Sequence, residues 1–541
     1  MTTLFVALVC VCPSNAVFGQ DDSNAEASTS NSTAEQPQAV ESSEAAAEKS
    51  TVAAIQEKIN GRVNTVVGFL EKVLFFAIPI PSTDKSIPLV LLVLILGGIF
   101  FTFRFGFINV RLFGHSIAVL RGKYDRPEDE GEISHFQALT SALSATVGLG
   151  NIAGVAVAIA TGGPGAVFWM WFIAFFGMSS KFVSCSFAQL YRRVTPDGRI
   201  LGGPMIYLED GIKEKYPALA PLGKIFGIMF AIFTMLAAFG GGNMFQGNQT
   251  FKILSTEFGV SNDYAWLFGV ILAVLVGCVI IGGIKRIGEV TSKMVPAMCV
   301  FYCTVCLIII FKNAGQVPEM IGSIFQSAFS PEAVFGGMIG VLITGARRAA
   351  FSNEAGLGSA AIAHAAAKTD EPVREGIVAM IGPFIDTIVV CTMTALALLI
   401  TKAHIDPATG QPFVEEIAKQ KDIAMTAEAF RTLGDWVPYL LCIAVCIFAY
   451  STMISWSYYG ERAAEYLFGR RGVVPFRIVF VIAVILGPIL SLKAVLDFSD
   501  MMLFSMAFPN IIGLVIISGM LKTKVNDYVS RLKSGEMSPE R

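Results

Sequence analysis

The residues best suited to do chemistry lie in a short glycine-rich segment, residues 144–154, inside an otherwise apolar stretch of the chain. Leu149 lies between Gly148 and Gly150, and two such glycines allow the backbone to leave helical geometry and to approach a ligand. A helix that begins there offers unpaired N–H groups and a partial positive charge, both suited to a carboxylate. The freed carbonyl groups suit a small hard cation such as Na⁺. Two side chains add polar partners, Thr146 and Asn151. Alternatively, the small residues only permit close packing of membrane helices.

A second glycine-rich segment, residues 344–359, repeats the pattern and adds charge. A Gly-Leu-Gly run within it echoes the first segment. It also carries Arg347, Arg348 and Glu354, and each ionised side chain would cost at least ~2.5–3.5 kcal/mol at the centre of a bilayer. Three such groups so close together require an aqueous or a paired setting.

We expect Glu354 to pair with one of these two arginines and to hold the second break in shape, while Ser352 and Asn353 reach the ligand. The three charged residues then have a structural or gating role. A purely structural salt bridge is an alternative for the arginines.

Two further polar clusters lie on apolar stretches. Asn243 and Gln246 are three residues apart, so on a helix they share one face. Ser451 and Thr452 offer adjacent hydroxyl groups, and Tyr450 adds a phenol. Because Ser and Thr hydroxyls in membrane helices often bond to the preceding turn, each cluster alone favours a structural role.

The remaining polar residues leave alternatives open. Asp386 could serve protons or cations, or it could form hydrogen bonds within the protein only, and Lys181 either pairs with a carboxylate or reaches the membrane interface. The four histidines show no metal-ligand spacing. The sequence has no zinc-protease helix, nucleophile elbow or phosphate-binding loop, so it indicates neither an enzyme nor an ATPase.

Composition indicates the elements that position these residues. Apolar residues make up 54% of the 541 and charged residues 15%, against about 25% in an average soluble domain. The chain is therefore predicted to be an all-α polytopic membrane protein, and its net charge of −2 gives no general attraction to nucleic acid. Eleven stretches near the ~20-residue length of a transmembrane helix are predicted to span the bilayer. They are residues 87–107, 135–160, 164–191, 225–246, 264–283, 294–312, 336–365, 376–400, 436–459, 478–492 and 501–521.

After the helix at 87–107, the other ten divide into two groups of five, residues 135–312 and residues 336–521. An odd number of spans in each group means that the two groups insert with opposite orientations. The first helix of each group is the glycine-broken one. Matching breaks in two inverted halves are typical of secondary transporters that bind their substrate at the membrane midplane.

The two ends of the chain have different characters. Residues 1–19 resemble a signal peptide, residues 20–54 are acidic and expected to be disordered, and residues 55–86 are predicted to form an amphipathic interfacial segment. Of the 40 Lys and Arg residues, 24 fall in the loops that are cytoplasmic if the N-terminus lies outside. We therefore expect an outside N-terminus and a cytoplasmic tail, residues 522–541, in a bacterial-type plasma membrane.

The run of sixteen residues from Gly162 to Gly177 resembles the signature of the sodium:alanine symporter family, also described as alanine or glycine:cation symporters. Three other segments are similar to family segments in the expected order: Gly203–Tyr207, Gly282–Arg286 and Gly345–Gly356. The resemblance covers about residues 87–525. It implies a leucine-transporter-like inverted repeat of ten helices, with one extra helix, that imports alanine or glycine together with Na⁺ and needs no cofactor.

The resemblance also implies roles for individual residues. The first break would receive the carboxylate of the amino acid, and Gln246 is similar in place to a polar group that family members use at the substrate. The implied substrate contacts at the break are Thr146, Gly148, Leu149, Gly150 and Asn151. The implied sodium site comprises Ser144, Val147, the Phe448 carbonyl, and the hydroxyls of Ser451 and Thr452.

Three other functions are compatible with the sequence. Proton coupling through Asp386 or Glu354 is the nearest, and an amino-acid sensor or a membrane enzyme is less favoured because the sequence shows no output domain and no catalytic constellation. Bulky residues near the breaks, Phe245, Phe351 and Tyr450, would limit the substrate to a side chain of one carbon or none. Alanine and glycine both satisfy that limit.

Overall fold

The computed structural model describes residues 76–537, apart from residues 80–85, 127, 197, 331–336, 414 and 491. The predicted signal peptide and acidic segment lie outside the described residues, as does most of the predicted interfacial segment, so these stay predictions. The described residues of the interfacial segment include β1 (Ala77–Pro79), which pairs antiparallel with β2 (Ser86–Pro88).

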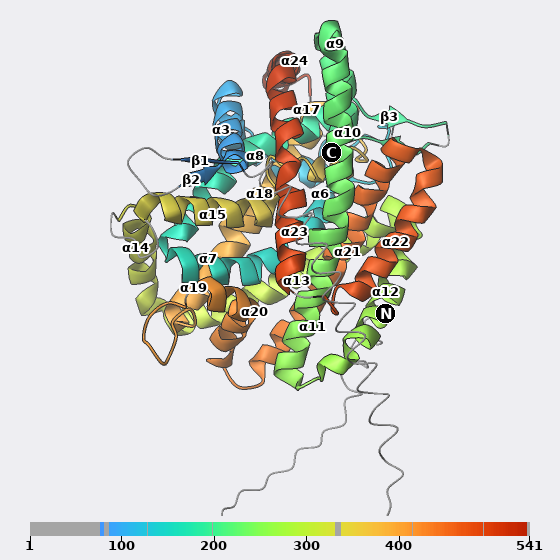
Figure 1. Ribbon diagram of the computed structural model, residues 1–541. Coiled ribbons are helices and arrows are strands. Elements are labelled where there is room, and N and C mark those ends of the chain that lie inside the picture. Colours follow the sequence, from blue (N-terminus) through green and yellow to red (C-terminus); the bar gives the residue numbers. More distant parts are fainter. Residues whose placement is uncertain are drawn as a thin grey trace, which may run out of the picture. The chain divides into compact units, whose positions relative to one another are not determined.

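Across the described part of the chain the fold is almost wholly helical (Figure 1). Seven helices, or eight if one bent pair counts as a single span, are long and apolar enough to cross a membrane. This confirms the prediction of an all-helical polytopic membrane protein. Three other predicted spans coincide with shorter helices of 16, 17 and 14 residues, which are α3 (Leu89–Arg104), α15 (Gly337–Asn353) and α22 (Val473–Leu486).

The first glycine-rich segment divides one span into two helices. α6 (His135–Thr146) begins with a capping box, in which the Ser134 hydroxyl accepts from the Gln137 N–H and the Gln137 side chain accepts from the Ser134 N–H. After a short non-helical stretch the chain resumes as a π-helical turn, η1 (Gly150–Gly154), and continues as α7 (Val155–Gly162). The two halves are bent by 55°.

After α7, helices lie before and after a short antiparallel pair of strands, β3 and β4. A π-helical turn joins α10 to α11, so that these two helices form one long span. The elements up to the second break are α4 (Ile108–Arg111) and α5 (Phe113–Leu120) before α6, then α8 (Gly165–Leu190), β3 (Arg193–Val194), β4 (Ile200–Leu201), α9 (Pro204–Lys215), η2 (Pro217–Leu219), α10 (Ala220–Phe239), η3 (Gly240–Met244), α11 (Phe245–Phe258), η4 (Asn262–Tyr264), α12 (Ala265–Ile280), α13 (Gly283–Lys312), η5 (Ala314–Gln316) and α14 (Val317–Ala328).

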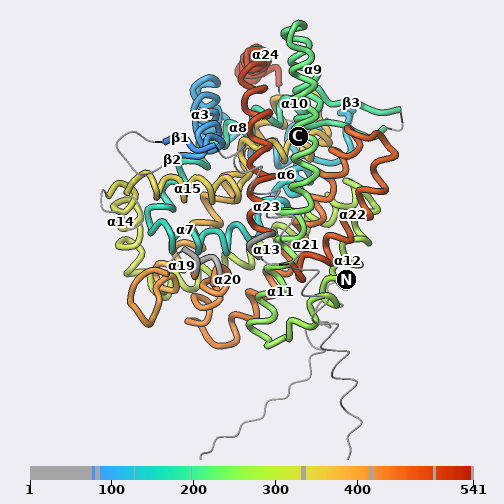
Figure 2. The backbone as a smooth tube through the Cα atoms, viewed as in Figure 1, coloured from blue at the N-terminus to red at the C-terminus, as the bar shows by residue number. Residues whose placement is uncertain are grey.

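The second glycine-rich segment ends α15 and separates it from α16 (Ala360–His364). Glu354, Gly356 and Gly358 have φ values of 54°, 88° and 95°, in the left-handed region that stops a right-handed helix and that glycine adopts freely. The elements after α16 are α17 (Pro372–Ala379), α18 (Ile381–Pro383), η6 (Phe384–Cys391), α19 (Thr392–Thr401), α20 (Glu415–Arg431), α21 (Val437–Phe468), η7 (Arg470–Gly472), α22, α23 (Leu492–Ser505) and α24 (Ala507–Ser534). α21 packs against α6, α10 and α13, and α15 packs against α7 (Figure 2).

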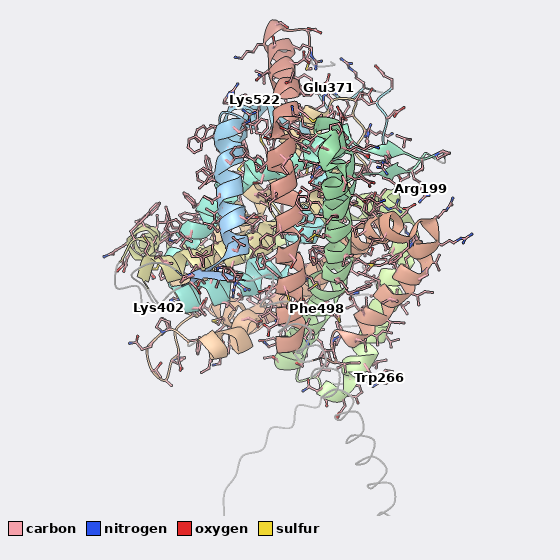
Figure 3. All side chains as sticks on the ribbon, turned by 45° about the horizontal axis from the view of Figure 1, so that its top comes forward. Arg199, Trp266, Glu371, Lys402, Phe498 and Lys522 are labelled. Atoms are coloured by element: carbon pink, nitrogen blue, oxygen red, sulfur yellow. The ribbon has the colours of Figure 1, made fainter. Side chains whose placement is uncertain are left out.

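The connections between helices group at two ends. Glu371, before α17, pairs with Arg531 near the end of α24 at 2.7 Å. Glu371 and Lys522 lie at one end, whereas Trp266 and Lys402 lie toward the other (Figure 3). The predicted topology places the first pair on one side of the membrane and the second pair on the other, and it stays a prediction.

α8 is the helix against which α3, α15 and α17 pack. Glycine permits the approach of α17, because a Cβ at Gly376 would lie 2.8 Å from the carbonyl oxygen of Phe182 and closer still to the Ser186 hydroxyl. A side chain at this position would push α17 away from α8.

Replacing Gly376 with alanine is expected to lower stability, because the added methyl group meets the backbone of α8. Overpacking of this kind typically costs about 1–3 kcal/mol, which should lower the midpoint of thermal unfolding of the detergent-solubilised protein. Gly277→Ala in α12 is the matched control, since a Cβ there meets nothing within 4 Å. Equal losses in the two variants would contradict this account of the packing.

Candidate functional site

A small buried cavity lies where the two interrupted helices meet. Its volume is about 20 Å³, and its walls come from the first break, the junction of η3 with α11, α15 with the second break, α21 and α23. A cavity of this size has room for about one water molecule, so an amino acid can enter only if the surrounding helices separate. Eight residues singled out in the sequence line it: Thr146, Gly148, Leu149, Gly150, Gln246, Phe351, Glu354 and Thr452.

The two glycines of the first break permit close contact between helices. Both have negative φ, so they are not needed for a left-handed conformation. A Cβ at Gly148 would lie 3.0 Å from the Thr452 hydroxyl oxygen, and a Cβ at Gly150 would lie 3.3 Å from the ring of Phe351. The absence of side chains therefore lets the break approach α21 and α15 directly.

Gln246 brings an unpaired acceptor to the cavity. Its Nε2 donates to the carbonyl of Gly241 at 2.9 Å, whereas its buried Oε1 has no hydrogen-bond partner among the described residues. That oxygen lies 3.8 Å from the position of a Cβ at Gly148, so it faces the first break. A buried acceptor without a partner is costly, and a donor on a ligand would satisfy it.

Asn151 connects the two breaks and does not line the cavity. Its Oδ1 accepts from the Gly148 N–H at 2.8 Å, and its Nδ2 donates to Asp386 Oδ1 at 2.7 Å and to the Ser352 hydroxyl at 3.0 Å. Ser352 and Thr387 donate to the other carboxylate oxygen of Asp386 at 2.7 and 2.8 Å. Asp386, whose role the sequence left open, is therefore the fully buried centre of a polar network.

Asn353 also forms hydrogen bonds within the protein and does not line the cavity. Its Nδ2 donates to the Thr387 hydroxyl at 3.0 Å, and its Oδ1 accepts from the Ala355 N–H at 2.9 Å. Its backbone carbonyl accepts from Lys181 at 3.2 Å, which places a positive charge at the C-terminal end of α15. Ser352 and Asn353 thus hold the second break against η6 and α8.

The prediction that Glu354 pairs with Arg347 or Arg348 is wrong. Glu354 accepts a hydrogen bond from the Ser359 hydroxyl within its own break, and Arg348 pairs with Asp500 of α23 at 3.3 Å. The reason is the left-handed conformation of Glu354, which takes its side chain off the surface of α15 that carries the arginines. Arg348 also lies over the ring of Phe351, 5.8 Å from its centroid, and Arg347 is partly exposed and does not line the cavity.

The residues of the implied sodium site meet between α6 and α21. The Ser144 hydroxyl donates to the Ser451 carbonyl at 2.6 Å, and the Thr452 hydroxyl donates back to the Ser144 carbonyl at 2.9 Å. The Ser451 hydroxyl donates to the Phe448 carbonyl at 2.9 Å. Val147, at the end of α6, is buried beside them. The structure therefore gathers hydroxyl and carbonyl oxygens at one buried place, which is the donor set that suits Na⁺.

Four further residues line the cavity, Ala145, Gly241, Trp456 and Leu503. Trp456 follows Thr452 by four residues on α21, so the helical period was a signal that could have revealed it. Gly241 belongs to a run of three glycines, and the neighbouring Gly242 packs directly on the Trp456 side chain. Leu503 had no such signal because it lies on a distant helix.

Three other residues singled out in the sequence, Phe245, Tyr450 and Asn243, are not in the cavity lining. Phe351 lines the cavity, and Phe245 contacts its ring at 5.7 Å between centroids. Tyr450 donates to the Leu275 carbonyl at 3.1 Å and so faces α12, and Asn243 donates to the Phe480 carbonyl at 2.8 Å. Tyr450 and Asn243 therefore join helices outside the cavity.

Apolar spans, a break in a membrane helix and a buried polar cavity at that break together define a polytopic membrane transporter. The model of the sodium:alanine symporter family matches residues 80–541, and the chain belongs to this family. It is a multi-pass amino-acid:sodium transporter by family, and not an enzyme, in agreement with the sequence.

Two named relatives are similar in sequence to this chain over most of their length. The sodium/alanine symporter AgcS of Methanococcus maripaludis is 44% identical over 440 residues, which are 81% of this chain and 94% of that protein. The probable sodium/glutamine symporter GlnT of Bacillus subtilis is 34% identical over 451 residues, or 82% of this chain and 89% of that protein. Among solved structures, MhsT in complex with L-phenylalanine aligns with a TM-score of 0.48 and 14% identity, over 73% of this chain and 99% of that one.

A double-mutant cycle tests the arginine pairing. Arg348→Gln or Asp500→Asn alone should destabilise the solubilised protein by up to about 3 kcal/mol, because each removes an ion pair between two mostly buried side chains. The double variant should recover part of that loss, as read from thermal unfolding. Arg348→Gln combined with Glu354→Gln should show additive losses, since the two side chains are not paired. Strong coupling between residues 348 and 354 would restore the original prediction.

Proposed function

We propose that this protein imports a small neutral amino acid, alanine or glycine, together with Na⁺, by alternating access across a plasma membrane. The observation that carries the proposal is the buried cavity at the meeting of the two helix breaks, beside a cluster of hydroxyl and carbonyl oxygens. Membership of the sodium:alanine symporter family and the 44% identity to the sodium/alanine symporter AgcS support alanine and Na⁺ as substrates.

The proposed topology has eleven transmembrane helices, ten of them in two inverted groups of five. The eight apolar spans together with α3, α15 and α22 account for this number. The N-terminus is placed outside and the C-terminus inside by the excess of Lys and Arg in one set of loops. The ion pair of Glu371 with Arg531 supports a common side for two of those segments.

The amino acid is proposed to bind with its carboxylate at the backbone amides of residues 148–150 and its ammonium at the Gln246 Oε1. This oxygen has no hydrogen-bond partner among the described residues, which supports an ammonium donor beside it. Trp456, Phe351 and Leu503 close the cavity, and their bulk favours a substrate side chain no larger than a methyl group. Thr146 lies at the end of α6, next to the proposed carboxylate position.

Na⁺ is proposed to bind at Ser144, Val147, Phe448, Ser451 and Thr452. In the closed structure several of these oxygens are paired with one another across α6 and α21. An ion that accepts lone pairs from the same oxygens replaces these hydrogen bonds and holds the end of α6 in one position. The first break is then ordered for the amino acid, and this shared conformational preference couples the two ligands.

The Asn151 network is proposed to keep the two breaks in a fixed relation. Asn151 satisfies the Gly148 amide, and through Asp386 and Ser352 it reaches the second break. Arg348 and Glu354 are proposed to act as structural or gating residues through Asp500 and Ser359. A movement of the first break is therefore transmitted to the second.

Proton coupling is the second candidate, and one observation favours it. Asp386 is a fully buried carboxylate that contacts both breaks, so a proton on it would change the hydrogen bonds of Asn151 and Ser352 together. In that mechanism the coupling ion is a proton on Asp386, in place of Na⁺ at the oxygens near Thr452.

Uptake of labelled alanine into proteoliposomes decides between the two ions. An inward Na⁺ gradient at equal pH should drive accumulation, a pH gradient in Na⁺-free buffer should not, and a negative interior should increase the rate because net charge enters. Unlabelled glycine should compete and leucine should not. Uptake driven by the pH gradient alone would remove the sodium assignment and favour Asp386.

Thr452→Val tests the sodium site directly. Loss of one oxygen ligand should raise the Na⁺ concentration for half-maximal alanine uptake by about tenfold, which corresponds to roughly 1.4 kcal/mol. Thr304→Val is the matched control, because its exposed hydroxyl on α13 bonds only to the preceding turn. An unchanged Na⁺ dependence in Thr452→Val would rule out this position as a ligand.

A further inference from the structure

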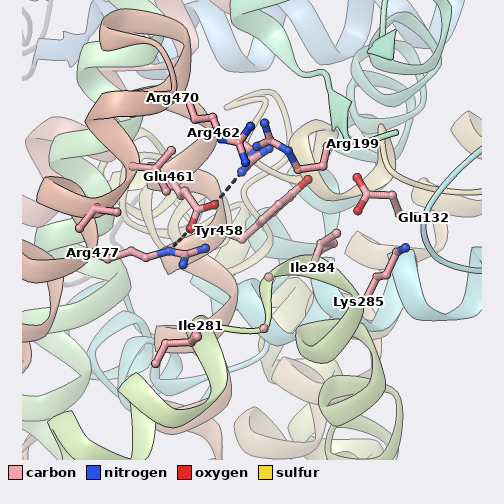
Figure 4. Close-up of a pocket in the computed structure, with 14 residues that line it drawn as sticks. Glu132, Arg199, Ile281, Ile284, Lys285, Tyr458, Glu461, Arg462, Arg470 and Arg477 are labelled. Atoms are coloured by element: carbon pink, nitrogen blue, oxygen red, sulfur yellow. Dashed lines mark hydrogen bonds and ion pairs between the residues drawn. The ribbon is translucent and has the colours of Figure 1, made fainter. Parts of the chain in front are cut away.

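A second cavity, far larger than the first, lies where α12 turns into α13 and α21 turns into α22 (Figure 4). Its volume is about 450 Å³. Its lining is rich in basic side chains, and we call it the basic pocket. The basic residues are Arg199, Lys285, Arg462, Arg470 and Arg477, and the acidic ones are Glu132 and Glu461.

Basic side chains outnumber acidic ones among the described residues in and beside the basic pocket. Glu461 accepts from Arg462 and from Arg477, each at 2.6 Å. Glu465, next to the pocket, pairs with Arg199 at 3.0 Å and with Arg462 at 2.8 Å. Among the described residues, five basic side chains therefore lie beside three carboxylates when Glu132 is included.

A buried donor in the pocket lacks a partner. Arg462 is only 5% exposed, and its Nε makes no hydrogen bond to any described residue. Tyr458, 4% exposed, lies against the guanidinium of Arg462 at 5.2 Å from its ring centroid, and its side chain points toward Arg199 (Figure 4). An unpaired buried N–H on a charged group is costly, and an anion is the ligand that satisfies it.

Two helices also begin at the basic pocket. α13 starts after Gly282 and α22 starts after Gly472, and neither has a side-chain cap or an acidic residue in its first turn. The N–H of Val473, at the start of α22, donates to the Arg470 carbonyl of η7. The first N–H groups of α13 and the positive ends of both helix dipoles add to the charge of the arginines. Together these features match a phosphate group, which arginine binds in a bidentate manner.

Exposed apolar side chains distinguish a lipid from a soluble anion. Ile281 and Val474 line the pocket and are 72% and 61% exposed. Ile478 and Ile482 follow Val474 at intervals of four residues on α22, so they continue one exposed apolar face away from the pocket. A ligand with a charged head and an apolar chain fits this combination.

We propose that the basic pocket binds an anionic phosphate group, and that this group is the headgroup of a membrane phospholipid whose acyl chain lies along α22. The site is separate from the proposed amino-acid cavity, since the two share no lining residue. Basic clusters near the membrane surface attract anionic lipids with about a fivefold gain in affinity for each positive charge.

Thermal unfolding of the full-length protein in detergent micelles tests this assignment. Dioleoyl-phosphatidylglycerol should raise the unfolding midpoint in a saturable manner, and dioleoyl-phosphatidylcholine should raise it much less. The gain should shrink as choline chloride is added at constant Na⁺, because salt screens the charges. Equal stabilisation by the two lipids would overturn the proposal.

A double variant with its control keeps the test specific. Lys285→Gln/Arg470→Gln should weaken phosphatidylglycerol binding by about twenty-five-fold, and Lys293→Gln, whose side chain is 79% exposed on α13, should leave it unchanged. The comparison uses the shift caused by lipid, so a lower starting stability of the variant does not obscure it. Unchanged lipid binding in the double variant would overturn the proposal.

Inorganic phosphate forms the last arm of the experiment. If phosphate alone stabilises the wild-type protein as much as phosphatidylglycerol does, and the double variant loses that effect, the pocket takes a soluble anion and the lipid assignment is wrong. Little effect of phosphate beside a strong effect of phosphatidylglycerol supports the lipid.

Discussion

A helix that ends inside a membrane leaves N–H and C=O groups with no water to bind, and the way this chain satisfies them shapes the whole site. The amide of Gly148 is taken by Asn151, the carbonyl of Ser144 by Thr452, and the carbonyl of Asn353 by Lys181. The last two of these partners come from helices other than the broken one. The same hydrogen bonds that allow each break therefore also join it to α21 or α8.

This arrangement explains why the two proposed ligands share one place. A broken helix exposes backbone dipoles in pairs, amides at one end and carbonyls at the other, and these suit a carboxylate and a cation respectively. The closed cavity of about 20 Å³ is consistent with a conformation in which protein groups satisfy one another. Ligands that replace such internal bonds stabilise a different arrangement of the same helices, which is the physical basis of alternating access.

Prediction from the sequence succeeded where a local property was enough and failed where a distant partner decided the outcome. Eight of the residues singled out in the sequence line the cavity. The polar ones among them could be found because polar groups inside apolar membrane helices are costly unless they face one another, water or a ligand. Glu354 was expected to pair with Arg347 or Arg348 because these residues are close in the chain, whereas Arg348 pairs with Asp500, 152 residues away. Asn151 was expected at the substrate, yet it bonds to Asp386 at a separation of 235 residues.

The sequence by itself determined the membrane class, most of the spanning segments, the positions of both glycine-rich segments and the family, since hydropathy, glycine and a sixteen-residue signature are local features. Only the tertiary structure decided which polar groups meet, that the glycines of the first break serve close contact instead of a left-handed turn, and that arginines from separate helices and loops converge on one pocket. The physical reason is range: burial and backbone propensity act within a few residues, whereas a hydrogen bond or an ion pair depends on which helices pack together.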